Sequence, residues 1–362
     1  MENLLLEARF RHAQYYSKFL DYLDATYLDG SENALLAIKL LDKNIGQIRK
    51  GHQYSVEYFS ESMQFARLCA EYPHAGAYVL DVYFPYNEYI PWLLIGIKAG
   101  EKIVDSLLKN RLLNNLGLAY FHLGDFEQAI DCYQKRLLFA QKNGDKRGES
   151  IALGNLATAY RHIGNTTIAL KLQLQSLQID REIGDIRNQG IDLNNLGRTY
   201  ETMGEYKLAR DCYTERLSIA ETLGDVRGVA SGMGNLGKIY LALDSVDSAI
   251  KYLEGGLERS EKISYRDGEI LSLTGLGDAY KKMQDLEQSK IYYYKALAIA
   301  QKNGLKFDEG NIFWQISQLL YQKGDLMESS TYAQKALRIL KRINSVIAND
   351  VEKFLQKLVQ EP

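Results

Sequence analysis

Side chains able to hold a partner recur at a fixed spacing in this sequence. Asparagine stands at Asn115, Asn155, Asn195 and Asn235, one every forty residues. A side-chain amide has both donor and acceptor atoms, so it can pair with the backbone of an extended peptide whatever that peptide's sequence. Asparagine is a mediocre helix former, so helix propensity does not explain its choice. The spacing predicts a row of amides that holds a peptide; the alternative is that each amide caps or bridges to a neighbouring helix.

Basic side chains accompany the asparagines at Arg111, Arg161, Arg198, Lys238 and Lys281. Acidic side chains at Glu201 and Asp278 dilute their charge. Because arginine pairs with carboxylates in a two-pronged geometry, these positions predict a peptide or protein segment that carries some acidic residues. A solvated helix face is the alternative interpretation. The candidate groove residues are Arg111, Asn114, Asn115, Asn155, Arg161, Asn194, Asn195, Arg198, Asn235, Lys238 and Lys281.

Gly232, Gly237 and Lys238 match most of a phosphate-binding loop. Ile239, however, stands where that loop needs Ser or Thr to hold Mg²⁺, and the loop must follow a strand. Here the same residues lie in the middle of an expected helix. Nucleotide binding is therefore not predicted at this position.

His122 and His162 share one position forty residues apart. A zinc site needs three or four ligands in set geometry, and no third His or Cys falls in register with this pair. The sequence also contains no arrangement typical of a serine hydrolase or a helix-borne zinc protease. We therefore expect no metal, no cofactor, no catalytic residue and no enzymatic activity.

A forty-residue unit, repeated from residue 111 to residue 342, must position these side chains. Glycines recur every twenty residues, at Gly124, Gly144, Gly164, Gly184, Gly204 and Gly224. Glycine can adopt the left-handed conformation that ends a helix. The residue after each glycine is expected to cap the next helix; these residues are Asp125, Asp145, Asn165, Asp185, Glu205 and Asp225. Each twenty-residue block is thus predicted to be one helix and one tight turn.

Apolar residues inside each unit follow helical spacing, as Leu193, Leu196, Gly197 and Tyr200 do. A small residue recurs at positions 117, 157, 197, 237 and 277, where the partner helix should come closest. Since one helix pair cannot bury both of its faces, the pairs must stack on their neighbours.

The set Leu196, Gly197, Tyr200 and Ala209, with its copies, resembles the tetratricopeptide repeat family in its forty-residue variety. The family's proline near the end of each unit is replaced here by Gly-Asp turns. The resemblance implies an all-α protein, a right-handed α-solenoid of stacked helix-turn-helix repeats. It also implies that the first helix of each pair lines the concave side. We expect a helical N-terminal region of degenerate repeats at 1–105, six repeats at 106–342 and a C-terminal capping helix at 343–362.

The segment from Arg11 to Tyr16 resembles the start of the sensor region of bacterial STAND or NB-ARC-type signalling NTPases. Leu41 and Asp42 resemble a second landmark of those proteins, although Asn44 and Gln47 depart from their pattern. The resemblance implies that residues 1–105 lead into the repeats as degenerate copies. An aromatic stretch at 72–92 predicts either a ligand pocket or internal packing.

Charge and hydropathy narrow the classes of partner. The 362-residue chain has a formal net charge of −2, which gives no reason to expect nucleic acid or an anionic membrane surface. Its longest apolar run, 89–97, is far shorter than the roughly 20 residues of a membrane-spanning helix. A cytoplasmic location is expected, and the sequence leaves the oligomeric state open.

The sequence is compatible with three functions. The first is a non-catalytic protein–protein interaction scaffold with a peptide or protein segment in its groove. The second is the partner-sensing region of a bacterial signalling or defence system of the STAND NTPase type. The third is a peptide receptor of the quorum-sensing type, which would need an N-terminal effector bundle that residues 1–70 do not clearly encode.

Overall fold

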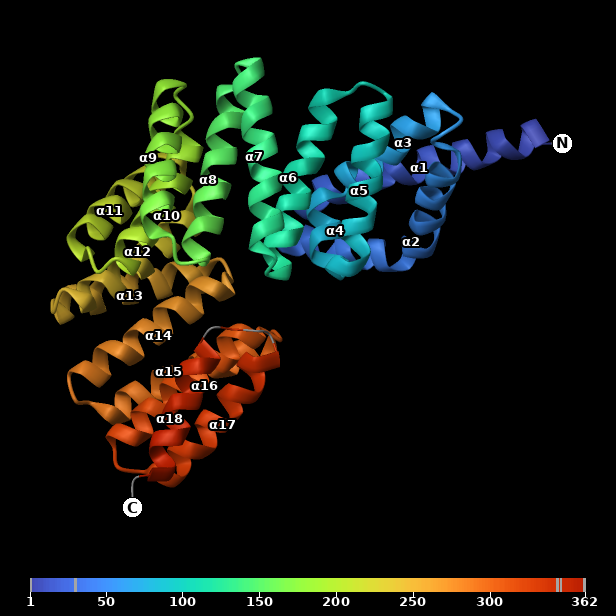
Figure 1. Ribbon diagram of the computed structural model, residues 1–362. Helices are drawn as coiled ribbons and strands as arrows, with labels where there is room; N and C mark the ends of the chain where they lie inside the picture. Colours follow the sequence, from blue (N-terminus) through green and yellow to red (C-terminus); the bar gives the residue numbers. More distant parts are fainter. Residues whose placement is uncertain (1, 29–30, 343–344, 346, 361–362) are drawn as a thin grey trace. The chain divides into compact units, whose positions relative to one another are not determined.

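The computed structural model describes residues 2–28, 31–342, 345 and 347–360, and within these ranges it contains 18 helices and no strand (Figure 1). By their internal contacts the residues fall into two compact units, 1–184 and 185–362. Unit 1 contains α1 (Glu2–Leu28), α2 (Ser31–Tyr58), α3 (Met63–Ala75), α4 (Ala77–Tyr83), α5 (Tyr86–Lys102), α6 (Ser106–Leu123), α7 (Phe126–Asn143), α8 (Lys146–His162) and α9 (Thr166–Glu182). Unit 2 contains α10 (Ile186–Thr202), α11 (Tyr206–Leu223), α12 (Val226–Ala242), α13 (Val246–Lys262), α14 (Arg266–Lys282), α15 (Leu286–Lys302), α16 (Lys306–Gln322), α17 (Leu326–Arg342) and α18 (Ile347–Gln360).

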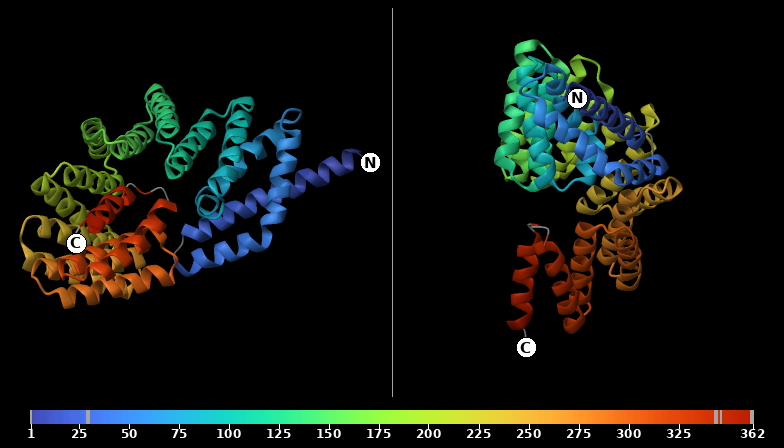
Figure 2. Two further views of the ribbon diagram at one scale, coloured as in Figure 1. Left: turned by 60° about the horizontal axis from the view of Figure 1, so that its bottom comes forward. Right: turned by 90° about the vertical axis from the view of Figure 1, so that its right-hand side faces the viewer.

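Successive helices pack as antiparallel pairs inside each unit. In unit 2 the pairs α10/α11, α12/α13, α14/α15 and α16/α17 stack one upon the next (Figure 2). The prediction of an all-α solenoid of stacked helix pairs is therefore confirmed. None of the helices in the described ranges is both long and apolar enough to cross a membrane.

The twenty-residue turn keeps its geometry even where glycine is lost. All six predicted glycines have positive φ, from +64° at Gly224 to +87° at Gly124. The same turn position is occupied by residues other than glycine at Val104, Asp244, Ser264 and Gln284, which also have positive φ. Because such residues rarely adopt this conformation, the stacked helices hold these four turns against a local preference.

The predicted helix caps are confirmed at Asp125, Asp145, Asn165, Asp185 and Asp225, each of which accepts a hydrogen bond from the backbone N–H three residues on. The prediction is wrong at Glu205, whose side chain makes no capping bond with α11. Glutamate has one methylene more than aspartate, which suits its carboxylate less well to the neighbouring N–H groups.

A glycine on the first helix and a large side chain on the second fit together in most pairs. A Cβ added to Gly197 would lie 2.6 Å from the ring of the buried Tyr213. Gly117 with Tyr133 and Gly277 with Tyr293 repeat this fit, and Leu253 plays the same part opposite Gly237. The predicted small residues thus mark the closest approach of paired helices.

The region 1–105 is helical, as predicted, but its helices have irregular lengths and depend on aromatic packing. His52 is buried and stacks on Trp92 with ring centroids 3.7 Å apart. Tyr72 is buried beside both rings and donates a hydrogen bond from its hydroxyl to the Ala13 carbonyl at 2.8 Å. Of the two interpretations of residues 72–92, internal packing describes Tyr72 and Trp92, whereas Tyr78 and Tyr89 line a hollow.

The C-terminal helix α18 forms over Ile347–Gln360 and packs on α17. Phe354 of α18 contacts Trp314 and Tyr321 of α16 edge to face. This helix therefore covers apolar side chains of the last pair, as a terminal cap must. The expected boundaries at 105/106 and 342/343 stay predictions, and residues 343–344, 346 and 361–362 lie outside the described ranges.

Candidate functional site

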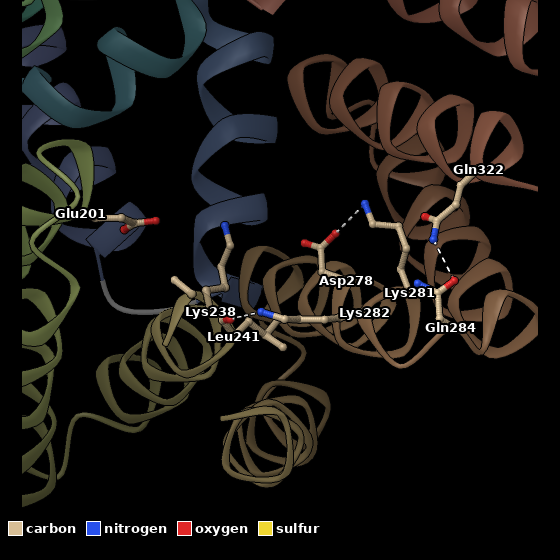
Figure 3. Close-up of a pocket in the computed structure, with 9 residues that line it drawn as sticks. Glu201, Lys238, Leu241, Asp278, Lys281, Lys282, Gln284 and Gln322 are labelled. Atoms are coloured by element: carbon tan, nitrogen blue, oxygen red, sulfur yellow. Dashed lines mark hydrogen bonds and ion pairs between the residues drawn. The ribbon is translucent and has the colours of Figure 1, made fainter. Parts of the chain in front are cut away.

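A hollow of about 490 Å³ opens on unit 2 against the first helices of its pairs (Figure 3). It is lined by Glu201 of α10, Lys238, Leu241 and Ala242 of α12, Asp278, Lys281 and Lys282 of α14, Gln284 in the turn after α14, and Gln322 of α16. These residues come from the C-terminal part of each first helix or from the turn that follows. Lys238 and Lys281 of the predicted groove are therefore brought together in one hollow.

Most charges in this hollow already have partners. The Lys281 ammonium lies 3.7 Å from the Asp278 carboxylate. Lys282 pairs with Asp244 and donates to the Leu241 carbonyl at 2.8 Å. Lys238 is exposed, and the described residues supply it with no acidic partner. In Figure 3 the Lys238 side chain lies between Glu201 and Asp278, and no dashed line joins it to either.

Two tyrosines reach from second helices to the acids of the hollow. The Tyr213 hydroxyl donates to Glu201 at 3.1 Å, and the Tyr293 hydroxyl donates to Asp278 at 2.5 Å. Burial is the main cause that raises the pKa of both phenols above its ordinary value. These tyrosines therefore stay protonated and orient the two carboxylates at the edge of the hollow.

The asparagine row makes bridges between successive first helices. The Asn155 amide donates to Asn114 Oδ1 at 2.9 Å, and the Asn235 amide donates to Asn194 Oδ1 at 3.2 Å. Arg136 of α7 also donates to Asn114 Oδ1. The alternative stated for this row, a bridge to the neighbouring helix, describes these bonds. A role in holding a peptide stays a prediction for the remaining donors and acceptors of these half-buried amides.

The other predicted residues separate into two groups. Arg111, Asn114 and Asn115 line a different hollow, of about 260 Å³, on unit 1. The remaining predicted residues line neither hollow; they are Asn155, Arg161, Asn194, Asn195, Arg198 and Asn235. Only Lys238 and Lys281 on unit 2, and Arg111, Asn114 and Asn115 on unit 1, thus contribute to a hollow.

Sequence reasoning missed Ala242, Lys282, Gln284 and Gln322 as lining residues. A signal for part of this set was present, because Ala242, Lys282 and Gln322 occupy one position forty residues apart. That position follows Leu241 and Lys281 directly and faces the same side. The sequence does not record which of these side chains packing brings to the same hollow.

Gly232, Gly237 and Lys238 lie inside α12, which follows helix α11 and not a strand. Within the described part of the chain, no three His, Cys, Asp or Glu side chains are arranged to hold a metal ion.

Comparison with protein families gives one match. The family model described as "Tetratricopeptide repeat" matches residues 108–182, 149–222 and 228–302, which together make up more than half of the chain. No curated protein matched the chain.

Solved structures with a similar fold share little sequence with this chain. The apo form of the quorum sensor NprR from B. thuringiensis superposes with a TM-score of 0.65 at 14% identity, over 84% of this chain and 85% of its own. Aspartyl phosphate phosphatase F from Bacillus subtilis gives 0.65 at 10% identity, over 91% and 93%. A STAND protein with a tetratricopeptide repeat sensor from Pyrococcus horikoshii gives 0.56 at 16% identity, over 85% of this chain and 49% of its own. This chain thus spans about half of that STAND protein, and these likenesses concern the fold.

Proposed function

Because this chain belongs to the tetratricopeptide repeat family, we propose that it is a non-catalytic scaffold that binds a peptide or protein segment against its first helices. The proposal rests on the hollow of unit 2, where a lysine without an acidic partner stands among charges that are already paired. An exposed surface of this kind can exchange water for a partner's groups without breaking an internal ion pair.

The chemistry of the hollow favours a segment with an acidic side chain. A carboxylate placed at Lys238 would form a charge-assisted hydrogen bond, which is stronger than a neutral one. Glu201 and Asp278, held by their tyrosines, can accept hydrogen bonds from backbone N–H groups or from a basic side chain nearby. The partner is thus an extended segment in which an acidic residue is flanked by donors.

A second candidate function is partner sensing in a bacterial signalling system. It is supported by the similarity of fold to a quorum sensor and to a STAND protein with a repeat sensor. In that case the bound segment would be the signal, and its binding would change the arrangement of the repeats. Linkage of this chain to an effector or NTPase in its natural setting would favour this candidate.

Binding of the full chain to an array of random decapeptides tests the scaffold function. Each acidic peptide is paired with a copy in which Glu and Asp are replaced by Gln and Asn. We expect the acidic copies to bind more tightly, and Lys238→Glu to weaken them about tenfold or more, because it replaces an attraction with a repulsion. The preference should also weaken as salt is added.

Lys251→Glu is the matched control, because Lys251 is also exposed but lies on the second helix α13 of the same unit. It makes the same charge change outside the hollow and should leave the affinity unchanged. Equal losses in both variants, or no preference for acidic copies, would refute the assignment of the hollow.

A further inference from the structure

The hollow of unit 1 differs from that of unit 2 in how its charges are arranged. It lies where α3, α4 and α5 meet the first repeat pair, α6 and α7. Its charged lining residues are Asp81, Arg111 and Arg136, and His74, Tyr78 and Tyr89 are the other titratable ones. The volume of about 260 Å³ is near the lower end of the range for small-molecule sites, so it suits a ligand no larger than one amino acid.

Two guanidinium groups on this lining have no acidic partner among the described residues. Arg111 donates from Nη1 to His74 Nε2 at 3.3 Å. Arg136 donates to the Asn114 side-chain oxygen, and burial lowers the pKa of its guanidinium although Asp145 acts on it from a distance. Both side chains are thus positioned by neutral acceptors, and most of their N–H groups remain available for a carboxylate.

One carboxylate on the same lining also lacks a partner. Asp81 of α4 is half-buried, and within the described part of the chain it forms neither an ion pair nor a hydrogen bond. Burial is the main cause that raises the pKa of this carboxyl group, and His122 opposes it. A half-buried charge without a partner destabilises the fold unless something else pairs with it.

The two signs of charge therefore face one hollow without touching each other. In the hollow of unit 2 the opposite charges of Asp278 and Lys281 form an ion pair. In unit 1 neither Arg111 nor Arg136 pairs with Asp81, although all three line the same space. A ligand that carries both charges would satisfy the two sides at once.

We propose that this hollow binds a free α-amino acid, with its carboxylate at Arg111 and Arg136 and its ammonium group at Asp81. The guanidinium of Arg111 matches a carboxylate with two parallel N–H groups. The Asn115 amide adds a donor on the same side, and Leu118 adds an apolar wall for the ligand's side chain. Failure of the peptide experiment on unit 2 would leave this site untouched, because no residue is shared between the two hollows.

Calorimetric titration and thermal melting of the full chain with each of the twenty free amino acids test this site. We expect at least one of them to bind saturably and to raise the melting temperature by about 2 °C or more at high excess. Its N-acetyl and its amide derivatives should not bind, because each lacks one of the two charges. Binding of a derivative as tight as that of the free amino acid, or no binding by any amino acid, would overturn the proposal.

Substitutions of the lining residues test whether the ligand binds in this hollow. Asp81→Asn and Arg111→Gln should each weaken binding about tenfold or more, since each leaves one charge of the ligand unpaired. Glu127→Gln and Lys142→Gln make the same charge changes on exposed positions of α7 outside the hollow, and should bind as the unmodified protein does.

The unliganded variants separate a binding role from a structural one. Asp81→Asn removes a half-buried charge that has no partner, so its melting temperature without ligand should stay the same or rise. A structural role for Asp81 predicts the opposite, a lower melting temperature. A fall in melting temperature together with unchanged affinity would therefore refute the assignment of Asp81.

Discussion

Unit 1 and unit 2 are built from the same kind of helix pair, yet the groups buried at their centres differ. All five histidines of the chain lie in residues 1–184, and one of them, His52, is buried against Trp92. Residues 185–362 contain no histidine and depend on the fit between glycine and tyrosine or leucine. The regular repeats are thus held together where the backbones of paired helices come close. The irregular N-terminal helices are instead held together by aromatic rings, and the titratable His52 is buried among those rings.

One pair in unit 1 shows that the glycine fit is a matched set. In α8 and α9, Ala157 stands at the glycine position and Gln173 at the tyrosine position. In α10 and α11 of unit 2 the same two positions hold Gly197 and Tyr213. A larger residue on the first helix is therefore accompanied by a slimmer one on the second.

The largest expected effect comes from breaking this match in unit 2. Gly197→Ala should destabilise α10 and α11 by about 2 kcal/mol or more, because the new methyl group would overlap the buried Tyr213 ring. The double variant Gly197→Ala, Tyr213→Gln copies the pair found in unit 1 and should recover much of that loss. Hydrogen exchange of peptides from α10 and α11 measures both values.

Gly232→Ala is the matched control for this experiment, because its Cβ would meet Leu217 at an ordinary 3.4 Å. It lies inside α12, so it should be neutral or stabilise unit 2 by about 0.5 kcal/mol through helix propensity. A double variant no more stable than Gly197→Ala alone would contradict the matched set.

The second largest effect is a difference between the two units in how their stability depends on pH. Burial lowers the pKa of His52 from 6.5 to about 3, so the folded protein keeps it neutral while the unfolded chain protonates below pH 6.5. The free energy of unfolding of unit 1 should therefore fall with falling pH in the window from 6.5 to about 3. The loss attributable to His52 is about 2 kcal/mol at pH 5.

Urea denaturation at pH 7 and pH 5 measures this loss, with Trp92 fluorescence followed in a Trp314→Phe background. In His52→Phe the ring against Trp92 remains but cannot take up a proton, so the extra loss at pH 5 should disappear. Unit 2 contains no histidine and should show no such difference. An unchanged pH dependence in His52→Phe would show that other groups cause it.

Glycine substitutions at turns that have a positive φ without glycine should have a smaller effect, and this effect is a stabilisation. Val104→Gly should stabilise unit 1 by about 1 kcal/mol, because Val104 has φ of +57° and its side chain is 83% exposed. Gln284→Gly should do the same in unit 2, where φ is +64°. Thermal melting checks both, and Gly124→Val, which makes the reverse change at the same turn position, should destabilise unit 1 by a similar amount.

The smallest effect concerns the asparagine bridges. Asn155→Ala in unit 1 and Asn235→Ala in unit 2 each remove one side-chain hydrogen bond and should cost about 1 kcal/mol. Asn195 makes no such bridge within the described residues, so Asn195→Ala should leave the melting temperature unchanged. If all three variants keep their stability but lose affinity for an acidic peptide, the row serves the partner rather than the fold.

Several local features could be predicted because each depends on neighbours in the sequence. The glycine turns, five of six caps and the small residues of the closest approach follow from the forty-residue period. Glu205 was mispredicted because a carboxylate alone does not make a cap; the length of the side chain matters as well. The turns at Asp244, Ser264 and Gln284 were not recognised, since none of them contains the glycine that marks the other turns.

The amino-acid sequence by itself determined the repeat, its helix pairs and the family, because period, turn residues and apolar spacing all act over a few residues. Only the tertiary structure decided which polar side chains bind each other and which remain for a partner. Asn155 and Asn195 are indistinguishable in the repeat, yet one bridges to Asn114 and the other makes no such bridge. Likewise Asp278 meets a lysine, while Asp81 meets none among the residues that the structure describes. The distance between side chains on different helices is set by packing, which no periodicity within one helix records.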